Sequence, residues 1–203
     1  MIHDLRQEHK NVLLVDAGDF LWQKKYGELR AKTTAKAINM MRYDALNIAD
    51  GELSYGVDFL NEFAPRLLPL YVGSNITGIT DQNITKREKL PWRPYIIKTC
   101  NGVKVAVLGV ISSDLVGKAR IKEDKISIKD PEACLRRILP KAREKADLVV
   151  LLSHLGWEQS KELAGRVPGI DLAIVGHAFY PSFEPEKVGS TILLKNEIGR
   201  AHV

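Results

Sequence analysis

The chain has 203 residues, of which 45% are hydrophobic and 27% charged, a balance that excludes a disordered chain and predicts one globular domain spanning residues 1–203. No apolar run approaches the roughly 18 to 20 residues of a bilayer-spanning helix, so the sequence predicts no membrane segment. Basic residues exceed acidic ones by only five, 30 against 25. This excess suits an anionic small-molecule substrate and is too small to predict nucleic-acid binding.

Short apolar runs alternate with amphipathic stretches along most of the chain. This pattern predicts, in chain order, a helix before residue 10, a strand at 11–16, a helix at 28–41, a strand at 44–49, a helix at 57–63, a strand at 67–72, strands at 95–98 and 103–110, a helix at 131–145, a strand at 147–153, a helix at 159–167, and strands at 171–176 and 191–195. The alternation predicts an α/β layered fold, with one mixed sheet or two sheets packed together. The polar stretch from Gly78 to Leu90 is predicted to be an exposed loop.

An Asn-Gly pair and two cysteines add local constraints. Asn101-Gly102 lies between two apolar runs, which is a strong signal for a β-hairpin inserted into the β-α-β pattern. Cys100 and Cys134 form no Cys-x-x-Cys pattern and exclude a cysteine-rich zinc module. They leave open one disulfide or, as the simpler interpretation, two buried thiols.

Candidate metal ligands follow four of the predicted strands. Asp19 and Asp50 come after the first two strands, and His154 and His177 come after the strands at 147–153 and 171–176. In open α/β sheets, ligands bind beyond the carboxyl ends of the strands, so we expect these four side chains to converge. Two carboxylates and two imidazoles suit Mn, Fe or Zn, and such an ion would lower the pKa of a bound water and polarise a phosphoryl oxygen.

Each of these residues also has a purely structural interpretation. Aspartates after strands, including Asp16 and Asp19, commonly form turns or cap helices, and either histidine could bond a loop backbone. The set is more informative than its members, because two of only five histidines end apolar strands. The other three, His3, His9 and His202, have no such placement and are predicted to lie on the surface.

Several short motifs occur in an order and spacing that resemble a known family. They are VDAGDF at 15–20, YDAL at 43–46, ELSYG at 52–56, LSHLG at 152–156, VPGID at 167–171 and GH at 176–177. Together they resemble the metallophosphoesterase (calcineurin-like) domain of 5'-nucleotidases and 2',3'-cyclic phosphodiesterases, over nearly the whole chain. The resemblance implies a four-layer α/β/β/α sandwich with metals at the strand ends, held here by Asp19, Asp50, His154 and His177.

The sequence departs from the family pattern at three places. The opening Asp-x-His motif is absent, so the resemblance implies that the first strand is missing from this chain. Gly51 replaces a family histidine that serves the leaving group, which leaves the catalytic residue unassigned, and Phe179 replaces the second histidine of Gly-His-x-His. These three groups belong to the other metal site or to catalysis, so the resemblance implies one divalent ion, Mn, Zn or Fe, in this chain.

The resemblance implies a metal-dependent phosphoester hydrolase of the 5'-nucleotidase type, acting on a small phosphoester such as a nucleotide. Two alternatives stay open: a non-catalytic metal- or ligand-binding module, and a hydrolase of a non-nucleotide substrate such as a sulfur ester. The chain contains no counterpart of the 5'-nucleotidase substrate domain, and Trp22, Trp92 and Trp157 are expected to pack in the core or at its rim. Export is expected only from the resemblance, and the oligomeric state stays open.

Overall fold

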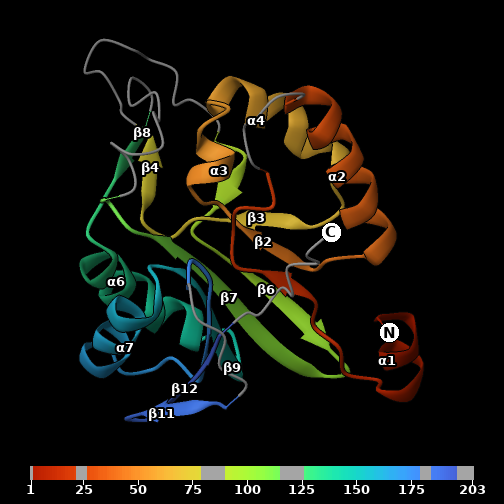
Figure 1. The fold of residues 1–203 in the computed structure, drawn as a ribbon. Helices are drawn as coiled ribbons and strands as arrows, with labels where there is room; N and C mark the ends of the chain where they lie inside the picture. Colours follow the sequence, from red (N-terminus) through yellow and green to blue (C-terminus); the bar gives the residue numbers. More distant parts are fainter. Residues whose placement is uncertain (1, 22–26, 79–89, 115–125, 179–183, 196–203) are drawn as a thin grey trace.

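The computed structural model describes residues 2–21, 27–78, 90–114, 126–178 and 184–195. Two larger sheets and one two-stranded sheet are present in this part of the chain (Figure 1). The loop predicted between Gly78 and Leu90 lies almost wholly outside the described residues.

The first sheet is parallel throughout and carries the N-terminal half of the site. Its strands, in spatial order, are β1 (Val15–Asp16), β2 (Ala45–Asn47), β3 (Leu70–Val72) and β5 (Trp92–Arg93). The strands predicted at 11–16, 44–49 and 67–72 are present but shorter. Pairing between β1 and β2 begins at Val15. Just before it, the Leu14 N–H donates to the Asp44 carboxylate (2.9 Å) and the Leu14 carbonyl accepts the Asp44 N–H (2.7 Å).

The second sheet is mixed. In spatial order its strands are β11 (Glu186–Val188), β12 (Thr191–Lys195), β10 (Leu172–Val175), β9 (Leu148–His154), β7 (Val103–Ile111) and β6 (Tyr95–Cys100). The four inner strands are parallel, and β6 and β11 are antiparallel edges. The predicted hairpin is confirmed as β6–β7, where Asn101 (φ 46°) and Gly102 (φ 88°) both adopt the positive φ that a tight two-residue turn needs.

Very short elements escaped the sequence analysis. The two-stranded sheet pairs β4 (Ile76–Gly78) with β8 (Ile126–Ile128), and neither strand was predicted, nor were β5 and β11. Runs of two or three residues are too short to show the alternation on which a strand prediction rests.

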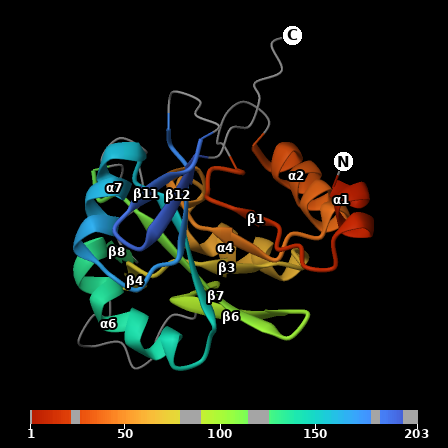
Figure 2. The ribbon, with the colours of Figure 1, turned by 90° about the horizontal axis from the view of Figure 1, so that it is seen from below.

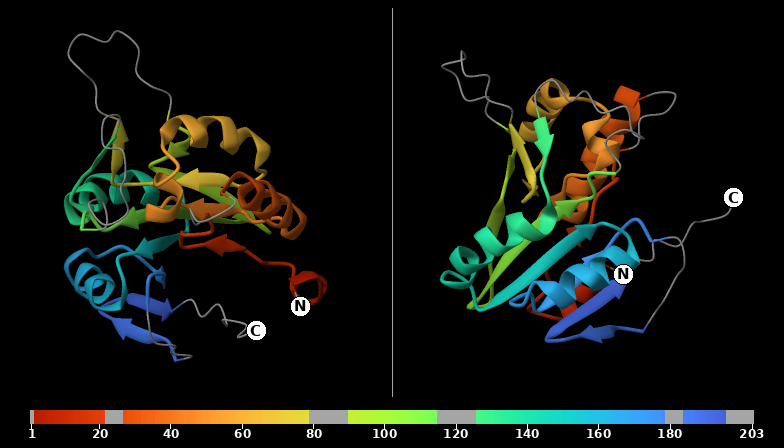
Figure 3. Two further views of the ribbon diagram at one scale, coloured as in Figure 1. Left: turned by 45° about the horizontal axis from the view of Figure 1, so that its top comes forward. Right: turned by 90° about the vertical axis from the view of Figure 1, so that its left-hand side faces the viewer.

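Helices cover the outer faces of both larger sheets. They are α2 (Gly27–Met41), α3 (Asp50–Leu53), α4 (Val57–Phe63) with a 3-10 turn (Ala64–Arg66), α6 (Pro131–Arg143) and α7 (Trp157–Arg166). A further helix, α1 (Ile2–Glu8), precedes them in the chain. Figure 3 shows α2 to α4 on one side of the molecule and α6 and α7 on the other. Within the described residues, none of these helices has the length and apolar character needed to cross a bilayer.

Helix α1 lies apart from the sheets, beside the end of α2 (Figure 2). The Arg6 guanidinium joins the two helices by donating to the carbonyl oxygens of Met41 and Arg42, at 2.6 Å each. A cation at this point also suits the partial negative charge at the carboxyl end of α2. The helix predicted before residue 10 is therefore confirmed.

Three buried apolar clusters separate four layers. The first lies between α2 to α4 and the first sheet, and the third lies between the second sheet and α6 and α7. The middle cluster joins the inner faces of both sheets and includes Val72, Val107 and Leu152, each fully buried. The α/β/β/α sandwich is confirmed, because each sheet buries one face against helices and the other against its partner sheet.

The two cysteines are not joined by a disulfide in the structure. Cys134 is buried on α6 and Cys100 is half-buried at the end of β6, and both thiols are free. The structure therefore has two free thiols, as the simpler interpretation predicted and the disulfide alternative did not, but only the Cys134 thiol is buried.

One buried amide joins the two sheets close to their carboxyl ends. The Asn47 Nδ2 group on β2 donates to the carbonyl oxygens of Ala17 (3.2 Å) and Val110 (3.1 Å). Asn47 is fully buried, and its side chain occupies the space beside Gly109 on β7, where a Cβ atom would overlap the Asn47 Oδ1 atom. Gly109 is therefore needed for the sheets to approach each other.

We expect Gly109→Ala to lower the free energy of unfolding by about 1 to 3 kcal/mol, the usual cost of overpacking a core. Gly165→Ala on α7 is the matched control, because its nearest neighbour is the Val188 Cγ1 atom at 3.6 Å and alanine favours a helix. Urea denaturation of both variants measures the difference. An unchanged midpoint for Gly109→Ala would contradict the role assigned to the close approach.

Candidate metal centre

The structure brings the four predicted side chains together from both sheets. Asp19 follows β1 and Asp50 opens α3 after β2, whereas His154 ends β9 and His177 follows β10. One ligand atom from each residue lies within 4.8 Å of all the others. The cluster therefore forms where the carboxyl edges of the two sheets meet, with the carboxylates from one sheet and the imidazoles from the other.

Unusual backbone conformations let the two loops reach this point. Asp19 (φ 66°) and His177 (φ 54°) both adopt the left-handed conformation, which few residues other than glycine occupy. Gly18 (φ 110°) precedes Asp19, and a Cβ atom there would lie 2.5 Å from the Ala49 Cβ and 3.1 Å from the His154 Nδ1. The loop after β1 can thus approach His154 only because residue 18 has no side chain.

A backbone carbonyl sets the orientation of His154. The Nδ1 atom lies 3.0 Å from the Ala17 carbonyl oxygen, which can only accept, so Nδ1 carries the proton and donates. The opposite ring atom, Nε2, then faces the carboxylates, 3.3 Å from Asp19 Oδ2 and 3.4 Å from Asp50 Oδ1. A carbonyl partner on the far nitrogen is the arrangement found for metal-bound histidines.

The charges in this cluster depend on each other. Burial opposes the charged form of His154, but the adjacent Asp19 and Asp50 outweigh burial and raise its pKa to about 10. Burial likewise disfavours the ionised form of Asp19, yet His154 and the Gly51 N–H together hold the Asp19 pKa below its ordinary value. Without a cation, the imidazolium is therefore the counter-charge of the two carboxylates.

Two atoms of the cluster fit a bound cation. His154 Nε2 and Asp50 Oδ1 are both buried and have no hydrogen-bond partner of suitable geometry. A buried polar atom without a partner costs free energy, and a metal ion between these atoms would remove that cost for both. Two carboxylate oxygens and two imidazole nitrogens are donors that Zn, Mn and Fe accept.

Comparisons with known proteins agree with this geometry. No protein-family model matches the sequence. Among curated proteins, the chain is 30% identical over 209 residues to the 2',3'-cyclic-nucleotide 2'-phosphodiesterase/3'-nucleotidase of Salmonella typhimurium, covering 88% of this chain and 31% of that protein. It is 27% identical to the 5'-nucleotidase of Rattus norvegicus, covering 87% of this chain and 31% of that protein.

Solved structures resemble the whole described fold. A sulfate thiohydrolase SoxB of Thermus thermophilus matches with a TM-score of 0.80 at 25% identity, over 96% of this chain and 36% of that one. The calcineurin-like phosphoesterase YfkN of Bacillus subtilis matches with a TM-score of 0.75 at 24% identity, over 95% of this chain and 70% of that one. The chain has the calcineurin-like phosphoesterase fold.

The homologues and structural neighbours of this calcineurin-like chain are 5'-nucleotidases, cyclic phosphodiesterases and calcineurin-like phosphoesterases, so the resemblance drawn from the motifs is confirmed. Nucleotidases and phosphoesterases are hydrolases. The chain spans about a third or less of the length of the curated relatives named here.

The glycine at position 51 has a steric reason in this calcineurin-like chain. A Cβ atom at Gly51 would overlap the Leu21 carbonyl oxygen and lie 2.8 Å from Asp19 Oδ1. The Gly51 N–H donates to the same Asp19 oxygen at 2.8 Å. The loop after β1 thus fills the space that a side chain at position 51 would need. The other departure, Phe179, lies outside the described residues.

The structure also tests the predictions made for the tryptophans and for the histidines outside the cluster. Trp92 is buried in the first core, as expected, and its Nε1 donates to the Ile76 carbonyl at 3.2 Å. Trp157 is half-buried against the third core, with the Lys195 ammonium 4.3 Å from its ring centre. His3 and His9 are exposed. Trp22 and His202 lie outside the described residues.

Glu52, the first residue of the ELSYG motif, lies at the site, although the sequence analysis assigned it no role. Glu52, the third residue of α3, is fully buried behind Asp19 and Asp50. Burial and the adjacent Asp19 raise the Glu52 pKa to about 8, while N–H groups from Leu21, Asp19 and Ala49 act in the opposite direction. Its signal in the sequence is a glutamate at the third position of a helix, where a carboxylate often reaches back to the helix start.

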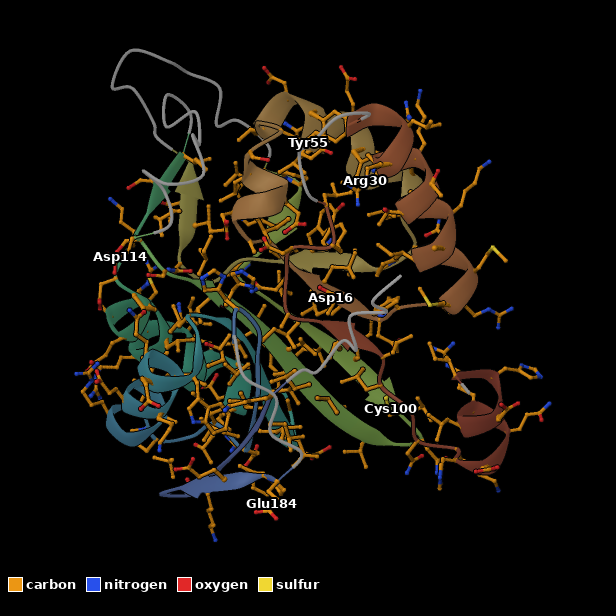
Figure 4. All side chains as sticks on the ribbon, viewed as in Figure 1. Asp16, Arg30, Tyr55, Cys100, Asp114 and Glu184 are labelled. Carbon is orange, nitrogen blue, oxygen red and sulfur yellow. The ribbon has the colours of Figure 1, made fainter. Side chains whose placement is uncertain are left out.

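Asp16 stabilises the turn that follows β1, as its structural interpretation predicted. Its Oδ1 accepts the Gly18 N–H at 2.8 Å, which shapes the loop that carries Asp19. Figure 4 labels Asp16 at the end of β1, where it is half-buried. Burial, opposed in part by the Gly18 bond, raises its pKa to about 6.

We expect Asp16→Asn to stabilise the metal-free protein at pH 7 and to change it little at pH 3. The pKa of Asp16 is higher in the folded state than the ordinary 3.8, so the unfolded chain loses its proton first and stability falls as pH rises from about 4 to 6. Asparagine keeps the acceptor for Gly18 and removes this loss, which is about 2 to 3 kcal/mol for a shift of about two units. Urea denaturation in EDTA between pH 3 and pH 7 measures the gain in stability. An equal gain at pH 3 and at pH 7 would contradict the raised pKa assigned to Asp16.

Proposed function

We propose that this chain is a metal-dependent phosphoester hydrolase of the 5'-nucleotidase type, acting on a small phosphoester such as a nucleotide. The observation that carries the proposal is the meeting of Asp19, Asp50, His154 and His177 at the joined edges of the two sheets. The curated relatives named above are nucleotidases and a cyclic-nucleotide phosphodiesterase, which supports the same reaction class.

These four residues would hold one divalent transition metal, Mn, Zn or Fe. A metal there would act as a Lewis acid on a phosphoryl oxygen and lower the pKa of water. One ion is proposed because, among the residues that the structure describes, these four side chains form a single group of candidate ligands.

The chain's own groups would prepare the site for an anionic substrate. The Ala17 carbonyl keeps the proton of His154 on Nδ1, so Nε2 presents its lone pair to the centre once the imidazole is neutral. Asp19 and Asp50 together carry two negative charges, which balance a dication and leave the centre without net repulsion toward a phosphate. Gly18 and Gly176 let the neighbouring loops close tightly against the His154 ring.

The alternatives raised by the sequence have less support. A non-catalytic metal- or ligand-binding module would use the same four side chains, but the curated relatives named above are a phosphodiesterase and a nucleotidase. A sulfate thiohydrolase shares the fold with this chain at 25% identity, but the curated relatives given above are named as nucleotidases and a cyclic-nucleotide phosphodiesterase. We therefore keep the phosphoester assignment as the single proposal.

The test combines metal analysis with an activity assay. Protein purified without chelator and loaded with Mn²⁺ is expected to hold one ion per chain and to hydrolyse nucleotides or an aryl phosphate. His154→Ala is expected to lower this activity by at least about 100-fold, since even residues behind metal ligands contribute about 10- to 100-fold. His9→Ala changes an exposed histidine that does not belong to the cluster, so this variant is the matched control and should keep full activity.

Two results would reject the proposal. The first is a protein that stays free of metal after loading with Mn²⁺ and with Zn²⁺. The second is a metal-loaded protein whose hydrolysis of phosphoesters is the same with and without the His154 side chain.

A further inference from the structure

Glu52 makes an unusual set of contacts for a fully buried carboxylate. Its Oε2 accepts the N–H groups of Asp19 (3.0 Å) and Ala49 (3.0 Å), and its Oε1 accepts the N–H of Leu21 (2.7 Å). All three partners belong to the backbone, and they come from two segments that are distant in the sequence. The carboxylate therefore joins the loop after β1 to the start of α3.

The first of these segments needs such support. Asp19 has a φ of 66°, a conformation that a residue with a side chain keeps only when its surroundings hold it. Glu52 binds the backbone at Asp19 itself and again two residues later at Leu21, so it fixes the main chain through the strained position. The Gly51 N–H then fixes the carboxylate of Asp19 from the same helix.

The second segment is the start of α3, where Asp50 is the first helical residue. The residue before it is Ala49, whose methyl group cannot accept a hydrogen bond as a capping side chain would. Glu52 instead reaches back to the Ala49 N–H, which is half of the arrangement known as a capping box. The same carboxylate that supports Asp19 thus fixes the turn that presents Asp50.

From these contacts we infer that Glu52 is the positioning residue for both carboxylate ligands of the candidate centre. It sets the distance between Asp19 and Asp50 before any cation binds, and it does so through the backbone without touching the cation itself. This inference rests on the proposed function only in treating Asp19 and Asp50 as metal ligands.

The first experiment uses the unaltered chain and does not require metal binding. Hydrogen exchange in EDTA should show that the amides of Asp19, Leu21 and Ala49 are already protected, and that Mn²⁺ adds little. Free exchange of these amides in EDTA, with protection only after Mn²⁺, would overturn the inference, since the cation would then order the loop.

The second experiment separates positioning from stability. Glu52→Gln keeps the side-chain volume but directs an amide NH₂ at backbone N–H groups, and Glu52→Asp keeps the charge but is one methylene too short. Both are expected to bind Mn²⁺ at least tenfold more weakly by calorimetry. Asp171→Asn is the matched control: this carboxylate accepts the Val149 N–H (2.7 Å) and pairs with Arg143 (2.6 Å) in the other half of the sandwich. It should lose stability and keep the Mn²⁺ affinity within twofold.

The outcomes are distinguishable. Full Mn²⁺ affinity in Glu52→Asp would overturn the inference, because the charge alone would then suffice, and full affinity in Glu52→Gln would overturn it as well. An equal loss of affinity in Asp171→Asn would show that any destabilisation weakens the centre, and would overturn it too. If the unaltered chain binds no Mn²⁺, the proposed function fails, while hydrogen exchange in EDTA still decides whether Glu52 holds the two segments.

Discussion

The site depends on one backbone carbonyl, that of Ala17. It accepts a hydrogen bond from Asn47 Nδ2 on the first sheet and another from His154 Nδ1 on the second. This oxygen, together with the bond from Asn47 Nδ2 to the Val110 carbonyl, joins the two sheets where their carboxyl edges meet. Without the Ala17 carbonyl, the His154 ring would lose the partner that sets its orientation toward the carboxylates.

Around that carbonyl, the chain gathers three carboxyl groups, of which Glu52 and Asp50 are buried and Asp19 is half-buried. They lie on two short segments and are stabilised in two different ways. Asp19 and Asp50 face the His154 ring, whereas Glu52 is surrounded by backbone N–H groups. Buried carboxylates are tolerated only when they are paired or hydrogen-bonded, and here the pairing also determines which oxygens remain available to a cation.

Sequence patterns were sufficient for the elements that bury many side chains. The strand at 191–195 and the helix at 57–63 appear with the predicted bounds, because apolar periodicity over five or more residues reports directly on burial. The same patterns placed the four candidate ligands at strand ends, from which their meeting followed by topology. Helix α3 was not predicted, since its four residues show no periodicity and its start is fixed by Glu52. The space taken by the Leu21 carbonyl beside Gly51 has no sequence signal, because it depends on tertiary contact.

The ligand set is split between the two ends of the chain, with Asp19 near the beginning and His177 near the end. During synthesis, the first sheet and its helices could assemble long before β9 and β10 emerge, and they would present only the two carboxylates. The complete set of donors exists only when the second sheet has formed and packed against the first. A cation held by all four side chains would therefore be bound only after the two sheets have packed together.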